Sequence, residues 1–144
     1  MKWTPARIVR KQVWSAGLFT IVVDAPGVNE FEAGQFLQLG LRSAEKHIHR
    51  PYSVASPHGK QLDFFIVLVE DGELTPRLWN LNVGDELDVS TRAAGSFTLS
   101  QCPDADCLWL MATGTGLAPY VAMLRTHDAW KRYPKIVVVH GVRY

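Results

Sequence analysis

The sequence predicts a six-stranded β-barrel followed by the first β-α-β unit of an α/β domain, and three observations support this fold class. Through position 100 the apolar residues come in short blocks separated by Gly, Pro and Asp, which favours antiparallel strands. The run Cys107–Ala112 is continuously apolar, as in parallel sheets, and a glycine-containing loop and a helical pattern follow it directly. We therefore expect two domains, 1–100 and 101–144, joined near residues 100–106.

Six apolar blocks are expected to form the strands of the first domain. Six antiparallel strands suit a small closed barrel, because closure removes the edges that an open sheet would leave unpaired. The blocks are Ala6–Trp14, Leu18–Ala25, Phe36–Leu41, Tyr52–Ala55, Leu62–Val69 and Glu86–Ser90.

A short helix is expected between the fifth and sixth strands, over 75–81. Thr75 supplies a capping hydroxyl before Pro76, which suits the first helical position. Leu78 and Leu81 would then share a buried face.

The second domain is expected to consist of two parallel strands, Cys107–Ala112 and Lys135–Val139, around a helix over 117–124. Two strands and one helix cannot cover the apolar residues 136–139 on both faces, and a stable sheet normally needs three or more strands. We therefore expect either a fragment or a sheet that a partner completes.

Composition and charge exclude several function classes. The chain has 144 residues, of which 47% are hydrophobic, and a net charge of +1, which argues against binding to nucleic acid or to an anionic membrane. No apolar run approaches the ~18 residues of a membrane span, and residues 1–5 lack the apolar core of a signal peptide. We expect a cytoplasmic protein.

Metal and hydrolytic sites are not expected. The two cysteines are too few for a thiolate cluster, and His47, His49 and His58 lack metal-ligand spacing. No pattern indicates a nucleophile paired with a histidine.

The segment Arg50-Pro51-Tyr52-Ser53 is the most informative candidate binding motif. Alternate side chains of a strand share a face, so Arg50 and Tyr52 can point the same way. The guanidinium could bind phosphate oxygens while the ring offers a stacking surface, which suits a ligand with a flat ring and a phosphate. The alternative is a solvated charge beside a half-buried strand residue.

Two loops could complete a nucleotide site. The segment 72–78 leads into the expected short helix, whose free amides could bind a pyrophosphate, or it could be an ordinary helix connection. The segment 113–119 follows a buried strand and opens a helix, so Gly114 and Gly116 could let the backbone approach a nucleotide. The alternative for this second loop is tight packing alone.

In their order and spacing, these three motifs resemble those of the ferredoxin/flavodoxin–NADP reductases, specifically the bacterial branch. The resemblance implies an FAD-binding barrel, followed by the first β-α-β unit of a Rossmann-like NADP-binding domain. It also implies an oxidoreductase that uses FAD and NADP(H) and exchanges electrons with ferredoxin or flavodoxin.

The resemblance also assigns site residues. Ser53 would lie near flavin N5 and O4 as the catalytic residue, Tyr52 would stack on the isoalloxazine ring, and Arg50 would hold the pyrophosphate. The implied FAD contacts are Arg50, Pro51, Tyr52, Ser53, Phe65, Ile66, Val67, Leu68, Gly72, Glu73, Leu74, Thr75 and Thr115. The implied NADP contacts are Thr113, Gly114, Thr115, Gly116, Pro119, Val142 and Arg143, where Arg143 could pair with a 2′-phosphate.

Members of this family continue beyond the position that corresponds to Tyr144, so most of the pyridine-nucleotide pocket is expected to lie outside this chain. Two alternatives therefore stay open. One is an NADH-linked electron-transfer subunit or flavin reductase of the same superfamily, and the other is an FAD-binding module without reductase activity of its own. A full-length member is expected to be a monomer.

Overall fold

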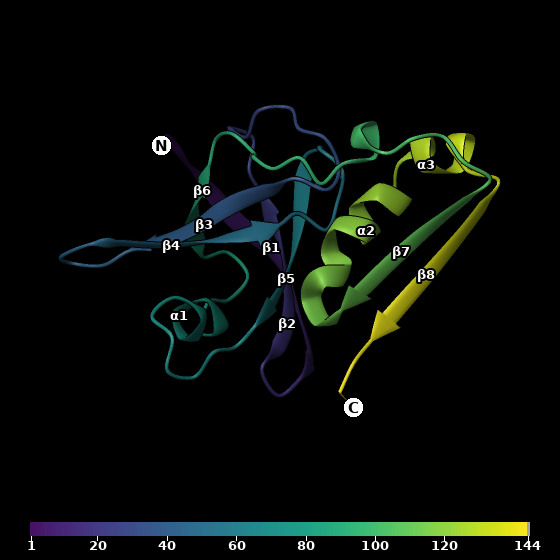
Figure 1. Cartoon of the computed structure of the whole chain (residues 1–144). Helices are drawn as coiled ribbons and strands as arrows, with labels where there is room; N and C mark the ends of the chain where they lie inside the picture. Colours follow the sequence, from purple (N-terminus) through teal and green to yellow (C-terminus); the bar gives the residue numbers. More distant parts are fainter. Residues whose placement is uncertain (144) are drawn as a thin grey trace.

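The computed structural model of the chain describes residues 1–143, and Figure 1 shows a β-sheet domain beside a small α/β unit. The β-sheet domain contains β1 (Trp3–Ser15), β2 (Leu18–Asp24), β3 (Phe36–Arg42), β4 (His47–Ser53), β5 (Gln61–Val67), α1 (Thr75–Trp79) and β6 (Glu86–Ser90). The rest of the chain contains η1 (Leu99–Gln101), β7 (Cys107–Thr113), η2 (Gly114–Leu117), α2 (Ala118–Leu124), α3 (His127–Arg132) and β8 (Lys135–Gly141).

The six strands of the first domain form one antiparallel sheet in the order β4-β3-β6-β1-β2-β5. The two ends of this order meet just after β4, where the amide of Ala55 donates a hydrogen bond to the carbonyl of Asp63 on β5 at 2.8 Å. The hydroxyl of Ser56 accepts a second bond from the Asp63 amide at 3.0 Å. The prediction of a six-stranded antiparallel barrel followed by a β-α-β unit is therefore confirmed.

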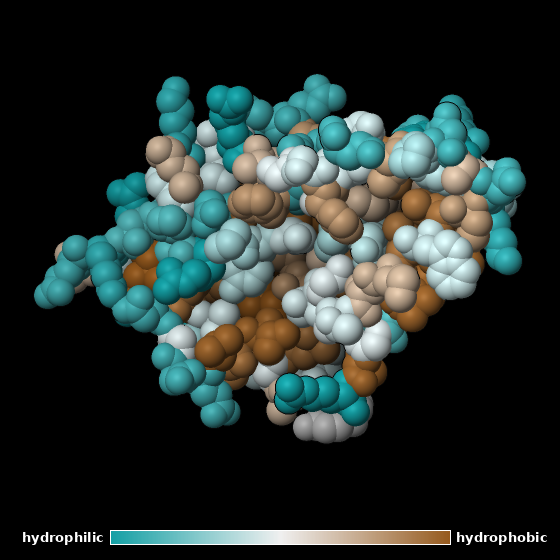
Figure 2. Space-filling view, viewed as in Figure 1, coloured by the Kyte–Doolittle hydropathy of each residue, from teal (hydrophilic) through white to brown (hydrophobic). Residues whose placement is uncertain are grey.

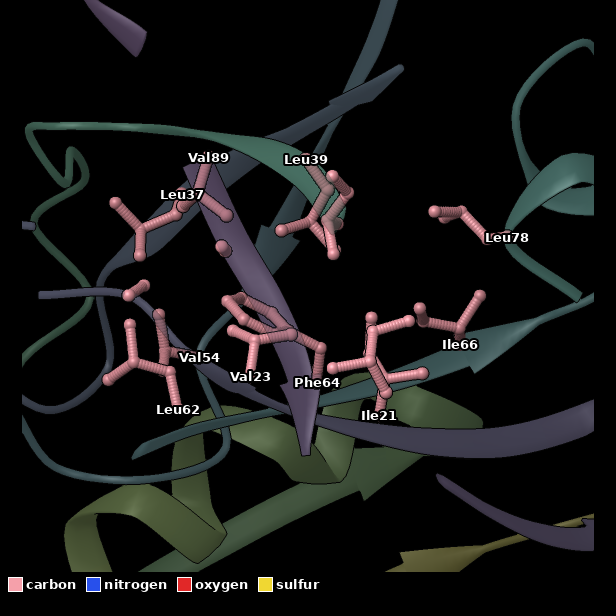
Figure 3. Packing of buried hydrophobic residues seen from close by; sticks show 14 of the residues in the cluster. Ile21, Val23, Leu37, Leu39, Val54, Leu62, Phe64, Ile66, Leu78 and Val89 are labelled. Carbon is pink, nitrogen blue, oxygen red and sulfur yellow. The ribbon is translucent and has the colours of Figure 1, made fainter. Parts of the chain in front are cut away.

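The barrel interior is filled by alternate side chains of its strands. Figure 3 shows that branched aliphatic residues and Phe64 converge on one apolar centre. Leu78 of α1 is fully buried against the same cluster, as the sequence predicts. The helix therefore closes one side of the barrel, and this contact positions the loop that precedes it.

Two local predictions are corrected. The fourth strand begins at His47 and ends at Ser53, where the sequence predicted 52–55. Pro51 is tolerated inside this strand because β4 is the last strand in the hydrogen-bonded order. Thr75 is the first residue of α1 and not its cap, since Leu74 occupies the N-cap position without a side-chain bond.

The second unit is a parallel pair, β7 and β8, with α2 packed on one face (Figure 1). Within residues 1–143 the other face of β7 is uncovered, since Trp109 is 59% and Met111 65% exposed, in agreement with the expectation that this chain alone does not complete the sheet. One layer of helix can cover only one face of a sheet. Short helix α3 was not predicted.

The barrel and the second unit approach closely at Gly34. This residue has φ +108°, and a Cβ atom there would lie 1.9 Å from the carbonyl oxygen of Phe97 and 2.8 Å from Met123 of α2. Nearby, the carboxylate of Glu32 accepts bonds from the amide and hydroxyl of Ser100 at 3.1 and 2.9 Å. Only glycine permits this junction.

Candidate functional site

Strand β4 carries Arg50 and Tyr52 on one face, as the alternation of a strand requires. Tyr52 packs partly against the barrel core, and its burial raises the pKa of the phenol, an effect that the nearby Arg50 opposes. Arg50 is exposed, and one guanidinium nitrogen donates to the carbonyl of His49 at 2.7 Å. A half-buried ring beside an exposed guanidinium can receive a flat ligand that carries an anionic group. Pro51 is exposed, and Ser53, which ends the strand, is half-buried.

The loop before α1 faces the same cation. The Glu73 carboxylate lies 3.8 Å from the guanidinium of Arg50 and accepts a hydrogen bond from Lys46 in the turn between β3 and β4. The bond and charge of Lys46, followed by the charges of Arg50 and Arg77, lower the pKa of Glu73. Lys46 and Arg50 thus pair with one carboxylate on the loop predicted to bind a pyrophosphate.

The structure limits how two residues of this loop can act. The hydroxyl of Thr75 accepts from the Val69 amide at 2.8 Å and donates to the Val69 carbonyl at 3.1 Å, so it closes the loop. The side chain of Leu74 is buried in the core. In this structure the Thr75 hydroxyl has a structural role, and the FAD contacts implied for both residues stay predictions. Gly72 donates its amide to Val69 in the same turn.

The strand β5 presents only part of its predicted flavin-lining set. The side chain of Ile66 points into the barrel core (Figure 3) and is fully buried, so it can contribute only main-chain atoms. Phe65 and Val67 alternate onto the outward face, and Val67 is 48% exposed. Leu68 is half-buried, and its amide donates to Gly17 at 2.6 Å.

A cleft of about 670 Å³ lies at the carboxyl ends of β7 and β8. It is lined by Val67, Thr113, Gly114, Thr115, Gly141, Val142 and Arg143. The predicted flavin-contacting residue Val67 therefore meets the predicted NADP-contacting loop here. Figure 2 shows hydrophobic surface in and below a hollow at the centre of the molecule, bordered by hydrophilic side chains.

Two residues of the predicted NADP set do not line this cleft. Pro119 is buried within α2, because it packs the first turn of that helix against its surroundings. Gly116 is exposed in η2 but lies outside the lining. Gly114 takes φ +53°, a left-handed conformation that favours glycine and aims the loop at the strand ends.

Sequence reasoning missed two residues that the fold brings to these sites. Lys46 reaches Glu73 only because the β3–β4 turn folds beside the loop before α1. His140 near the end of β8 places Nε2 2.9 Å from the carbonyl of Gly114. Both contacts join residues far apart in sequence, so the only local signal was a polar residue close to a motif.

The expectations about metals and membranes concern the whole chain, and the structure addresses residues 1–143. Within that range no group of three or more His, Cys, Asp or Glu side chains is arranged to hold a metal ion. The helices of this range are too short and too polar to cross a membrane.

Known proteins that resemble this chain share its fold and indicate one family. The family described as "Oxidoreductase FAD-binding domain" matches residues 5–98. The chain is 42% identical over 144 residues to a flavodoxin/ferredoxin–NADP reductase of Buchnera aphidicola and 41% identical over 143 residues to that of Escherichia coli. Each match covers 99% of this chain and 57% of the relative.

Solved structures extend the comparison. A crystal structure of a ferredoxin NADP+ reductase from Neisseria gonorrhoeae with bound FAD and NADP superposes with a TM-score of 0.94 at 28% identity. The superposition covers 100% of this chain and 59% of that one, so the chain spans little more than half the length of these relatives. The sequence match over the barrel, joined to the fold described above, shows that the chain belongs to the oxidoreductase FAD-binding domain family.

Proposed function

We propose that this chain binds FAD between β4, β5 and the loop before α1. We propose further that, in a protein as long as its relatives, it transfers electrons between NADPH and ferredoxin or flavodoxin. The observation that carries the proposal is the placement of Arg50 and Tyr52 on one face of β4, opposite the loop that contains Glu73. The names of the relatives, which are flavodoxin/ferredoxin–NADP reductases, support the same electron-transfer chemistry.

The described residues fit an FAD diphosphate. The carboxylate of Glu73 already stands where an anion is bound by Lys46 and Arg50, and a diphosphate could take its place. The main-chain amides of Leu74 and Thr75 lie on the same loop. In this arrangement Arg50 and Lys46 neutralise the diphosphate charge, and Tyr52 supplies the stacking surface for the ring.

FAD, when bound, supplies a ring that accepts a hydride from NADPH and releases single electrons to a protein acceptor. The residues of this chain position the two reactants. Ser53, on β4 beside Tyr52, would donate a hydrogen bond near N5 and O4 of the ring. Thr115 and Val67 line the cleft that would hold the nicotinamide and exclude water from it.

The nucleotide end of the cleft carries a cation. Arg143 lines it together with Val142 at the end of β8, and its guanidinium could pair with a 2′-phosphate. This placement supports NADPH over NADH, the cofactor of the alternative electron-transfer subunit or flavin reductase.

A second candidate function is an FAD-binding module that cannot reduce its flavin by itself. It is favoured by the exposure of Trp109 and Met111 on the second unit, where only one face of the sheet is covered. The two functions share the FAD site and differ in whether NADPH can deliver a hydride to it.

One experiment separates these functions. The purified chain is loaded with FAD, and its absorbance near 450 nm (about the oxidised flavin band) is followed during anaerobic addition of NADPH. Bound FAD is expected for both functions, and bleaching at stoichiometric NADPH would show that the chain itself can receive the hydride. Bleaching with dithionite alone supports the module, and absence of FAD binding by calorimetry contradicts both.

We also propose the division into an FAD-binding barrel, 1–100, and a partial NADP-binding unit, 101–144. Two clusters of buried apolar residues support it, one with buried members from 6 to 89 and the other from 99 to 133, and Ala33 of the barrel packs against the second. The cytoplasmic location and the monomeric state of the full-length protein stay predictions from the sequence.

A further inference from the structure

Asp63 is a buried carboxylate on the outward face of β5. Its side chain is only 11% exposed, and Oδ2 accepts a hydrogen bond at 2.9 Å from Nη1 of Arg125. Arg125 is the C-cap residue of α2 and therefore belongs to the second unit. Arg125 is 47% exposed, but removing it would leave the largely buried Asp63 carboxylate without its cation, which is unfavourable. The pair is therefore a directional, energetically sensitive contact between the barrel and the second unit.

This pair joins β5 and α2, and these two elements run antiparallel to each other. The outward face of β5 carries Asp63, which meets the C-terminal end of α2, and also Val67, which lines the cleft with Thr115 just before α2. Asp63 and Val67 are about 13 Å apart along an extended strand. The seven residues of α2 span about 10 Å, and the 3₁₀ turn before them adds the remainder. Strand and helix thus match in length.

We infer that Arg125 is a positioning residue for hydride transfer. Its pair with Asp63 sets where α2, and hence the loop around Thr115, lies along β5. Because Val67 of the same strand lines the cleft with Thr115, this placement determines the separation between the flavin ring and the nicotinamide. The inference rests on the proposed function for its catalytic consequence, and on geometry alone for the orientation of the two units.

The remaining contacts at the junction do not replace the pair. The backbone at Gly34 leaves no room for a Cβ atom beside Phe97 and Met123, and the centroid of the Phe97 ring lies 5.7 Å from that of Tyr120. These apolar approaches limit how close the units come, but they have no directional hydrogen bond that would fix the rotation. Glu32 binds Ser100, and Arg132 of α3 donates to the carbonyls of Leu99 and Cys102, so this contact anchors the second unit at the 99–102 segment. Without Arg125, the second unit can therefore pivot about this polar anchor.

The orientation is tested directly by residual dipolar couplings of the ¹⁵N-labelled chain. In the wild type, one alignment tensor should fit the amides of both 3–90 and 107–141. In Arg125→Met the two ranges should need different tensors, and in Arg125→Lys the single tensor should largely return. The matched control is Arg7→Met, which breaks an exposed pair with Glu86 far from the junction. A single tensor in Arg125→Met would overturn the inference.

The double variant Asp63→Asn/Arg125→Met guards against unfolding. Arg125→Met alone leaves a buried charge at Asp63, whereas the double variant removes both charges and keeps a comparable packed volume. It should remain folded and should still require two tensors. If the double variant is folded and one tensor fits it, the pair does not position the units.

A kinetic measurement connects orientation to chemistry. With FAD bound, the rate of anaerobic flavin reduction by NADPH should fall about tenfold to hundredfold in the double variant, because hydride transfer is sensitive to displacements of about 1 Å. The FAD content should stay unchanged, and Arg125→Lys should recover part of the rate. An unchanged reduction rate in the double variant overturns the catalytic part. A wild type that binds no FAD contradicts the proposed function, and one that binds FAD but is not reduced by NADPH supports the module. In both cases the couplings still decide the orientation.

Discussion

The guanidinium of Arg50 lies 3.8 Å from the carboxylate of Glu73, and Lys46 binds the same carboxylate from the β3–β4 turn. The three side chains come from a strand, a helix-leading loop and a hairpin turn, so the cation pair exists only in the folded chain. An acidic side chain that sits between two cations imitates the ligand that those cations are proposed to bind. The first prediction follows from that competition.

Neutralising Glu73 should tighten the binding of FAD. In Glu73→Gln the diphosphate no longer displaces a carboxylate from Lys46 and Arg50, so the Kd for FAD should fall several-fold in isothermal calorimetry. Glu86→Gln, which also removes an exposed carboxylate from an ion pair, is the matched control and should leave the Kd unchanged. An unaltered Kd in Glu73→Gln would mean that the carboxylate does not occupy the ligand position.

The Glu73 interaction should also be visible in the pH dependence of stability. Lys46 and the neighbouring arginines lower the pKa of Glu73 in the folded chain below its ordinary value of 4.5. A lowered pKa contributes stability above the unfolded-state value, and the contribution disappears as the pH falls through the folded-state value. The Tm of the wild type should therefore exceed that of Glu73→Gln at pH 7, and the two should converge as the pH falls through the lowered folded-state pKa of Glu73. A constant Tm difference would exclude this linkage.

Removing the guanidinium of Arg50 should release FAD. A charge-assisted hydrogen bond contributes about 2 kcal/mol, so Arg50→Ala should raise the Kd for FAD about 30-fold. Arg50→Lys keeps the charge but loses the forked geometry, and it should be intermediate. Flavin content is measured after gel filtration. If Arg50→Ala retains as much FAD as the wild type, the assignment of Arg50 to the diphosphate is contradicted.

The ring of Tyr52 should matter more than its hydroxyl. Loss of the aromatic surface in Tyr52→Ala should weaken FAD binding by about 1 kcal/mol and shift the flavin spectrum, because stacked aromatic pairs contribute about that much. Burial raises the pKa of the phenol above 10.0, so the group is neutral at pH 7 and carries no charge toward the ligand. Tyr52→Phe should therefore behave like the wild type. Equal losses in both variants would assign the effect to the hydroxyl.

Gly34 should tolerate no side chain. Both its φ of +108° and the approach of Phe97 forbid a Cβ atom, so Gly34→Ala should lower the free energy of unfolding by more than about 2 kcal/mol. Gly84→Ala is an informative control, because Gly84 has φ +97° with no atom within 4 Å of its Cβ position. That variant should show only the backbone cost, about 1–2 kcal/mol. Equal denaturation midpoints for the two would show that Phe97 moves aside freely.

The barrel and the start of the parallel unit could be predicted from the sequence because their signals are local. Alternating apolar residues at 62–66 mark a strand with one buried face, and the continuous run at 107–112 marks a different kind of strand. The strand over 86–90 was predicted with the bounds that the structure shows, because turn-forming residues directly precede it. The shared face of Arg50 and Tyr52 follows from strand alternation alone.

Errors arose where a tertiary contact overrides the local pattern. The strand β4 extends back to His47 although its sequence is polar, because the ladder to β3 pairs His47 with Arg42. Thr75 has the chemistry of a cap, but its hydroxyl is taken by Val69. Ile66 lies beside ligand-facing residues in the sequence but on the core face of the strand. Each of these depends on which groups happen to lie near in space.

The sequence by itself therefore determined the order of elements and the residue types that could meet a nucleotide, since periodicity and turn chemistry act over a few positions. Only the tertiary structure decided that Lys46 joins Arg50 at Glu73, and that Arg125 joins Asp63 across the junction. The partners in the second pair are separated by 62 positions. Such contacts depend on how the whole chain closes and packs, and no local pattern in the sequence encodes that.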